Sequence, residues 1–144
     1  MFKKIIVGVD FSEKTQKALG VAINLAKAVQ GEVVMVHVVP SVTESSPSSA
    51  AGGPSGEVTT TIEQRLRDDA VRLTSETGAK VDYGVVEGKP SEELINYIER
   101  WGGHVLVVGT EGRTGLGRII LGSVAERLIQ TSPVPVMVVG PNAL

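Results

Sequence analysis

Glycine and arginine are concentrated in one stretch of the chain, GTEGRTGLGRIILGSVAERL, at residues 109–128. Glycine carries no side chain, so the backbone amides beside it can come close to a ligand. The free amides and the dipole at the start of a helix attract anions, and arginine matches the geometry of a phosphate group. The chemistry that these residue types could do is therefore phosphate binding.

Two common phosphate-binding loops do not fit this stretch. Gly112 and Gly117 have the spacing of a Walker A loop, but that loop next needs a lysine, and Arg118 follows instead. A dinucleotide-binding loop built on Gly115 and Gly117 would need a small third residue, and that position is Ile120. A phosphate site in this stretch must therefore use other glycines.

Four residues remain that could form a cradle of hydrogen-bond donors. Gly109 and Gly112 follow a predicted strand, and Gly122 and Ser123 open the helix that comes next. The amides of that helix start and the Ser123 hydroxyl would face an anion. An alternative needs no ligand, because Ser123 and Glu126 have the spacing of a capping box. Both interpretations stay open on the sequence.

The elements that must position this stretch are short apolar strands that alternate with amphipathic helices. The predicted strands are rich in β-branched residues and span residues 4–9, 32–39, 80–86, 104–108 and 134–139. The predicted helices lie between Ser12 and Gly31 and over residues 62–76, 90–100 and 123–130. Ser12 would cap the first helix, and Thr60 with Glu63 would form a capping box for the second.

This alternation predicts one α/β domain over residues 1–144, built as a Rossmann-like three-layer sandwich around a five-stranded, parallel, doubly wound sheet. In such a sheet a ligand binds outside the carboxyl ends of the strands, where the strand order reverses. We expect the first and fourth strands to flank that point. Their carboxyl ends carry Asp10 and Gly109, so the glycine-rich stretch lies where a ligand site is expected.

Composition argues against several classes of function. The 144 residues carry a formal net charge of −2 and only 3% aromatic residues, which gives a nucleic-acid surface little support. The chain has no cysteine, which rules out disulfides, thiolate catalysis and cysteine-based metal sites. His37 and His104 fall on different predicted strands and suit packing better than a metal pair. No segment is apolar over a bilayer's thickness, so we expect a cytoplasmic protein without membrane or nucleic-acid partners.

One combination of motifs is specific for a known family. Gly109, Gly112, Gly122 and Ser123 meet the spacing G-x2-G-x9-G-[ST], which resembles that of ATP-binding universal stress proteins. The stretches GVDFS, VHVV, GKPSEEL and LGSVAERL agree with the same family. The resemblance implies a parallel five-stranded sandwich of the adenine nucleotide alpha hydrolase type. It also implies a homodimer that holds ATP or another adenine nucleotide, with or without Mg²⁺, across the first and fourth strand ends.

The resemblance also implies ten nucleotide-binding residues: Gly8, Val9, Asp10, Val38, Gly109, Gly112, Arg113, Gly122, Ser123 and Val124. Gly8, Val9 and Asp10 would line the adenosine end, and Asp10 would accept a hydrogen bond from adenine or ribose. The backbone of Val38 would contact adenine. Gly109 and Gly112 would face the ribose and phosphates, with Arg113 as a phosphate partner. The residues at the start of the last helix, Gly122, Ser123 and Val124, would hold the phosphates. The chain departs from the family at Glu111, where His or Arg is common and where a carboxylate would repel phosphates in the absence of a cation.

Three functions stay open on the sequence. In the first, ATP acts mainly as a regulatory ligand in a stress response, with at most slow hydrolysis. It would then change the dimer or a mobile loop predicted at residues 41–57, which are mostly small and polar. In the second, the protein is a true ATP-hydrolysing enzyme, although no catalytic residue is assigned. In the third, it is a dimeric scaffold without nucleotide. Pro133 and Pro135 indicate that the last strand, residues 134–139, lies at a sheet edge, where members of the family dimerise.

Overall fold

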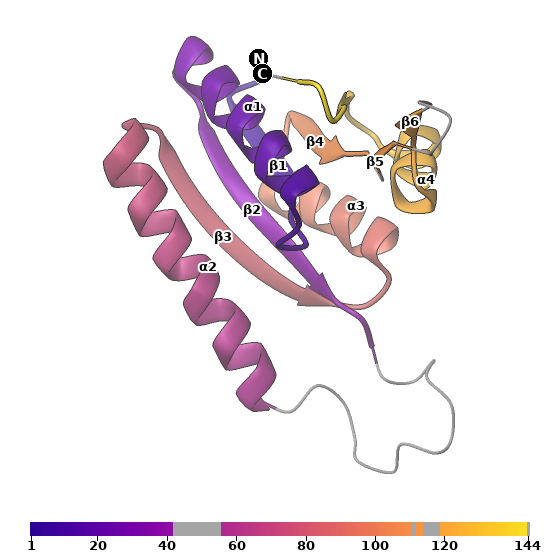
Figure 1. Cartoon of the computed structure of the whole chain (residues 1–144), viewed down its shortest axis with the longest axis horizontal. Coiled ribbons are helices and arrows are strands. Elements are labelled where there is room, and N and C mark those ends of the chain that lie inside the picture. The colour runs from indigo at the N-terminus through magenta and orange to yellow at the C-terminus, as the bar shows by residue number, and fades with distance from the viewer. Residues whose placement is uncertain (42–55, 111, 114–118, 144) are drawn as a thin grey trace.

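The computed structural model describes residues 1–41, 56–110, 112–113 and 119–143 of the chain. Its centre is a sheet of five parallel strands in the order β3-β2-β1-β4-β7 (Figure 1). These strands are β1 (Lys4–Gly8), β2 (Glu32–Val39), β3 (Lys80–Glu87), β4 (Val105–Gly109) and β7 (Val136–Val139). The predicted α/β fold with a five-stranded, parallel, doubly wound sheet is confirmed, and β1 and β4 are neighbours as expected.

The middle strand, β1, is closed off from solvent. Ile5, Ile6 and Val7 are each 0% exposed, because β1 pairs with β2 on one side and with β4 on the other while helices cover both faces. A strand in this position must be apolar on both faces, which the sequence KIIVG provides. The carboxyl ends of β1 and β4 therefore meet at one end of a fully buried core.

Two helices cover each face of the sheet (Figure 1). On one face α1 (Glu13–Val29) and α2 (Gly56–Thr77) pack around Ile5 and Val7. On the other face α3 (Pro90–Trp101) and α4 (Ser123–Thr131) pack around Ile6. Successive side chains of a strand point to opposite faces, so one strand supplies both cores and the domain has three layers. Within the described residues, no helix is both long enough and apolar enough to cross a membrane.

The second helix starts earlier than the sequence pattern predicts. It begins at Gly56 instead of residue 62, so Thr60 lies inside α2 and the capping box of Thr60 and Glu63 is wrong. Consecutive threonines look like a boundary, but each costs a helix only about 0.7 kcal/mol or less relative to alanine. Of the loop predicted at residues 41–57, the last two residues belong to α2, and residues 42–55 lie outside the described part of the chain.

Two other boundaries differ for identifiable reasons. The last strand begins at Val136 instead of residue 134, because Pro135 has no amide hydrogen and only its carbonyl joins the sheet, accepting from the Leu106 amide at 3.0 Å. The N-cap of α4 is Gly122, so Ser123 is the first helical residue and the capping box of Ser123 and Glu126 is wrong. The remaining boundaries agree with the prediction to within one or two residues.

A short hairpin between β4 and α4 was not predicted. It consists of β5 (Gly112–Arg113) and β6 (Ile119–Ile120), which pair antiparallel. Strands of two residues are too short to leave a periodic pattern in the sequence. Glu111, the residue that departs from the family pattern, lies outside the described residues.

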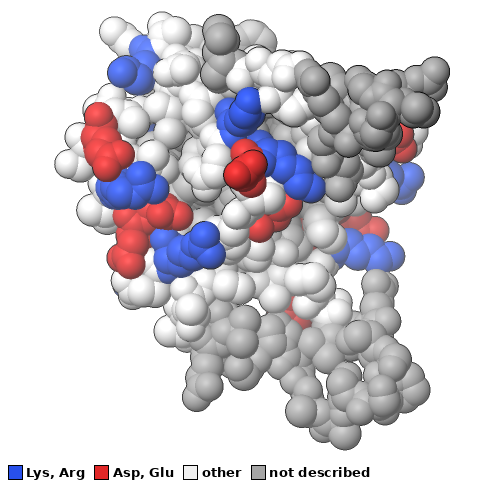
Figure 2. Space-filling view, in the orientation of Figure 1, with Lys and Arg blue, Asp and Glu red and all other residues white. Residues whose placement is uncertain are grey.

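Charged side chains of both signs are mixed over the described part of the face shown in Figure 2. Ion pairs account for several of the described charges. On α2, Arg72 pairs with Asp69 at 3.2 Å and with Glu76 at 3.4 Å. Between β3 and β2, Lys80 pairs with Glu32 at 2.7 Å. Mixed and paired charges of this kind do not create a strong field of one sign.

The first helix packs very closely against the end of β4. A Cβ atom added to Gly109 would lie 2.8 Å from the carbonyl oxygen of Lys14 and 3.2 Å from its Cβ. Gly109 is therefore required by the approach of the α1 backbone, a packing reason that differs from the ligand contact expected from the sequence. The contact places Lys14 at the carboxyl end of the sheet.

We predict that Gly109→Ala lowers the free energy of unfolding by about 1–3 kcal/mol, because the added methyl group must push the α1 backbone away from β4. Gly20→Ala is the matched control. Gly20 lies inside α1 and an added Cβ would have no atom within 4 Å, so alanine there should stabilise the protein by about 0.5–1 kcal/mol. Urea denaturation measures both changes, and equal effects of the two substitutions would contradict the close contact at Gly109.

Candidate functional site

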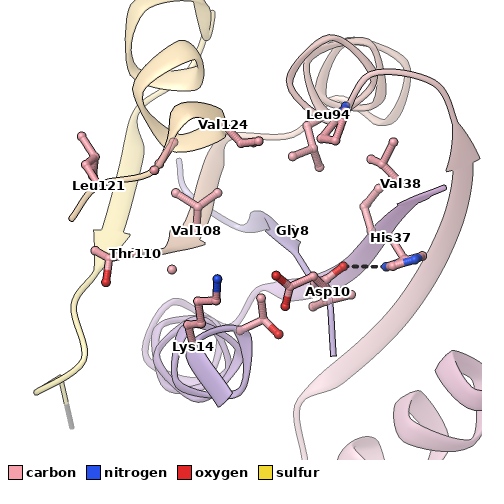
Figure 3. Close-up of a pocket in the computed structure, with 17 residues that line it drawn as sticks. Gly8, Asp10, Lys14, His37, Val38, Leu94, Val108, Thr110, Leu121 and Val124 are labelled. Carbon is pink, nitrogen blue, oxygen red and sulfur yellow. Dashed lines mark hydrogen bonds between the residues drawn. The ribbon is translucent and has the colours of Figure 1, made fainter. Parts of the chain in front are cut away.

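A pocket opens where the carboxyl ends of β1, β2 and β4 meet the starts of α1 and α4 (Figure 3). Its volume is about 200 Å³. Its apolar side chains come mainly from β2, α3, β4 and the segment that leads into α4, and they include Val36, Val38, Leu94, Val108, Leu121 and Val124. Its polar side chains include Asp10, Lys14 and Thr110. An apolar slot with a few polar groups is typical of a small-molecule site.

Seven of the ten predicted nucleotide-binding residues line this pocket: Gly8, Val9, Asp10, Val38, Gly109, Gly122 and Val124. Ser123 is not one of the lining residues, although it directly follows Gly122 at the start of α4. Gly112 and Arg113 form β5, and the Arg113 side chain lies outside what the structure describes. The fold thus brings together residues that lie more than a hundred positions apart in the sequence.

Asp10 is held in a tight turn between β1 and α1. The Ser12 amide donates a hydrogen bond to Asp10 Oδ1 at 2.9 Å, and Ser12 is the N-cap of α1 without a side-chain capping bond. Burial disfavours the charged carboxylate, but hydrogen bonds from Ser12 and the positive charge of Lys14 outweigh burial and hold the pKa of Asp10 below its usual value. The carboxylate is therefore ionised at neutral pH and can only accept hydrogen bonds.

His37 stabilises this turn from β2. Its Nδ1 lies 2.8 Å from the carbonyl oxygen of Val9, so Nδ1 carries the proton and donates it. Its ring packs on Phe11, with the ring centroids 4.9 Å apart, and the Arg65 guanidinium lies 4.1 Å from the Phe11 centroid. Phe11 has a positive φ of 66°, which is uncommon for a residue other than glycine. His37 thus has the packing role expected from the sequence and also holds the backbone of the site.

His104 lies at the opposite end of the sheet. Its Nδ1 accepts hydrogen bonds from the amides of Lys3 at 3.2 Å and Lys4 at 3.3 Å, beside the first residues of β1. The two histidines are therefore on opposite sides of the molecule, as their strand positions predict. Among the residues that the structure describes, no group of three or more His, Asp or Glu side chains is arranged to hold a metal ion.

The start of α4 borders the pocket. Gly122 has φ 63° and ψ 150°, and among the described residues no side-chain hydrogen bond caps the helix. The first amides of a helix lack partners inside the helix, and the helix dipole makes this end partly positive. Because Gly122, Val124 and Ala125 line the pocket, an anion inside it would lie beside these amides. Because Ser123 is not the N-cap, the capping box of Ser123 and Glu126 no longer explains why a serine occupies this position.

Three residues that shape the pocket were missed in the sequence. Lys14 extends from the first turn of α1 beside Asp10 (Figure 3). Thr110 is only 5% exposed, and its amide donates to the Val139 carbonyl at 3.2 Å. Leu94 covers β1 so closely that a Cβ on Gly8 would lie 3.3 Å from its Cδ1. A lysine in the first turn of a helix opposes the dipole and was a usable signal, whereas the other two depend on contacts between distant segments.

A sequence model of the universal stress protein family matches residues 1–140 of the chain. The chain is 34% identical over 146 residues to universal stress protein MJ0531 of Methanocaldococcus jannaschii. This alignment covers 96% of this chain and 82% of that protein. It is 31% identical over 147 residues to universal stress protein YxiE of Bacillus subtilis, with coverage of 96% and 99%.

Two solved structures with the same fold hold an adenine nucleotide. A universal stress protein in complex with cAMP has a TM-score of 0.71 at 24% identity, over 95% of this chain and 96% of that one. The universal stress protein from Archaeoglobus fulgidus in complex with dAMP has a TM-score of 0.71 at 19% identity, over 96% and 98%. The sheet order agrees with this likeness in fold, and the family match runs over nearly the whole chain. The protein belongs to the universal stress protein family.

Proposed function

We propose that the protein is an adenine-nucleotide-binding module that acts as a homodimer in a cytoplasmic stress response. The observation that carries the proposal is the composition of the pocket between β1, β4 and α4. There an apolar slot, the ionised carboxylate of Asp10 and an uncapped helix start lie together. These features suit, in turn, the base, the ribose and the phosphates of a nucleotide.

The adenosine would lie between the ends of β1 and β2. Val38 and Leu94 offer apolar surface to the base, and the Val38 backbone would contact the polar edge of adenine. Asp10 would accept a hydrogen bond from a ribose hydroxyl, because an ionised carboxylate only accepts. Gly8 and Val9 would line this end, where the missing side chain of Gly8 leaves room beneath Leu94.

The phosphates would lie toward the start of α4. The proposed contacts are the Ser123 hydroxyl and the backbone groups of five residues: Gly109, Gly112, Gly122, Ser123 and Val124. Arg113 would be a further partner. This part of the pocket fits an anion because the first amides of α4 have no side-chain cap. The motif spacing favours ATP as the nucleotide, and Mg²⁺ would enter with its phosphates.

Two proteins of the same fold support an adenine nucleotide as the ligand, since one was solved with cAMP and the other with dAMP. The pocket volume of about 200 Å³ is below the range of about 300–1,000 Å³ that is common for ligand sites. A pocket of this size would enclose the base and ribose and leave the outer phosphates toward solvent. We propose that the nucleotide acts mainly as a regulatory ligand, with at most slow hydrolysis.

The first test is a calorimetric titration of ATP, with and without Mg²⁺, into protein stripped of bound nucleotide. We expect one ATP per chain in the wild type and no binding to Gly122→Val. A side chain at this positive φ strains the turn and crowds the amides of α4. Gly20→Ala should bind as the wild type does, and circular dichroism should show that all three proteins are folded. Unchanged affinity in Gly122→Val would contradict the proposed phosphate end.

A second test concerns Asp10. We expect Asp10→Asn to weaken adenosine binding by roughly tenfold or more, because a hydrogen bond to a charged acceptor is lost, while Asp82→Asn on β3 has no effect. Since the folded pKa of Asp10 lies below the usual 3.8, wild-type affinity should be constant between about pH 5 and pH 8.

The same lowered pKa makes a prediction about stability. The ionised carboxylate stabilises the fold above the unfolded pKa, and this contribution is lost as the pH falls through the folded pKa. Acid titration followed by denaturant unfolding should therefore show the wild type losing stability relative to Asp10→Asn below about pH 4. A difference between the two proteins that does not change with pH would show that Asp10 titrates normally.

The homodimer would form through β7, at the edge of the sheet. In the part of the chain that the structure describes, β7 pairs with β4 on one side only, and an edge strand offers unpaired backbone groups to a second copy. Met137 on β7 is 37% exposed, and Ile129 on the neighbouring α4 is 49% exposed. These side chains would provide the apolar part of the interface.

We expect the wild type to sediment as a dimer and Met137→Lys to sediment as a monomer, because a lysine on the strand edge opposes pairing. Val71→Lys is the matched control, since Val71 is 66% exposed on α2, away from β7. Analytical ultracentrifugation measures both variants. A dimer that survives Met137→Lys would move the interface away from β7.

A further inference from the structure

Lys14 differs from the other lysines of α1. Lys17 and Lys27 are exposed, whereas Lys14 is partly buried and lines the pocket. In Figure 3 its side chain rises from the first turn of α1 and ends between Asp10 and Thr110. A cationic group therefore enters a pocket whose walls are mainly apolar.

Helix stability does not account for a lysine in this position. Lys14 is the second residue of α1, where the positive end of the helix dipole disfavours a cation. The other charges of the helix ends follow the favourable pattern, with Glu13 in the first turn and Lys27 in the last. Residues that break a local rule in this way are concentrated at functional sites.

The fold directs Lys14 toward the pocket through a backbone contact. Because Gly109 has no side chain, the carbonyl and Cβ of Lys14 lie directly against the end of β4. The first turn of α1 is thereby held beside the carboxyl ends of both β1 and β4. From this position the side chain faces the start of α4 across the pocket (Figure 3).

We propose that Lys14 binds the phosphate next to the ribose and makes the site selective for adenosine phosphates over adenosine. This inference rests on the proposed function, since it concerns the same pocket. Asp10 and Lys14 lie side by side, and the hydroxyls and the 5′-phosphate of a nucleotide are separated by only a few bonds. The carboxylate suits the hydroxyls, and the ammonium suits the phosphate.

The chemistry of lysine defines the class of ligand. An ammonium group is a compact charge with three donors and does not demand the planar, two-point geometry that arginine prefers. Lys14 on one side and the amides of α4 on the other would hold a single phosphate group between them. The selectivity thus concerns the first phosphate and applies to AMP as well as to ATP.

The experiment is a calorimetric titration of adenosine, AMP and ATP into the wild type, Lys14→Met, Lys14→Arg and Lys27→Met. In the wild type, AMP and ATP should bind more tightly than adenosine. Lys14→Met should weaken AMP and ATP by roughly ten- to a hundredfold, because a charge-assisted hydrogen bond is lost, and leave adenosine within about twofold. Lys14→Arg should restore most of the affinity. Lys27→Met makes the same charge change at the other end of α1 and should leave the three affinities unchanged.

The melting temperature separates a binding role from a structural one. Lys14→Met removes a cation from the positive end of the helix dipole but also removes the positive charge beside Asp10, so its melting temperature should lie close to that of the wild type. If methionine prevents folding, Lys14→Gln replaces it in the same titrations. Equal weakening of adenosine and AMP, or unchanged affinity for all three ligands, would overturn the role of Lys14 and leave the proposed function standing. A wild-type protein that binds none of the three would overturn both.

Discussion

The geometry of the site depends on one backbone contact, between Gly109 at the end of β4 and Lys14 in the first turn of α1. The three central residues of β1 are fully buried, and α1 follows the strand after a turn of only a few residues. The contact with β4 therefore determines the direction in which α1 leaves the sheet. That direction in turn places Asp10 and Lys14 side by side and leaves the space between β1, β4 and α4 open as a pocket.

The turn that carries Asp10 is held from several sides before any ligand binds. Phe11 adopts a positive φ, and strain of this kind persists only where the surroundings determine the conformation. His37 from β2 donates to the Val9 carbonyl and packs on Phe11, and Arg65 from α2 covers the same ring. Two elements, β2 and α2, thus hold this turn in place. A carboxylate held in this way loses little freedom on binding, which favours affinity.

Most of the fold was predictable because it follows from local patterns. Buried parallel strands read as apolar runs, and Pro90 at the start of α3 with Glu92 and Glu93 in its first turn marks that helix start correctly. Errors arose at the boundaries of helices and strands. β7 begins late because Pro135 has no amide hydrogen to donate to the sheet, and Gly122 takes the cap position that Ser123 was expected to fill.

The candidate site follows the same division. Glycines and Asp10 at strand ends could be located from spacing and topology, and seven of the ten predicted residues line the pocket. The close packing of Gly109 against Lys14 could not be predicted from the sequence, because it depends on the path of α1. The site and the proposed dimer edge also lie at the two ends of one short segment, since α4 starts at the pocket and leads through a single turn into β7. Ser132 closes that turn, donating to the Val134 carbonyl at 2.8 Å and accepting from its amide at 3.2 Å. A regulatory ligand must bind two states of the protein with different affinities. If α4 moved toward a bound phosphate, this hydrogen-bonded turn would transmit the movement to the edge strand β7.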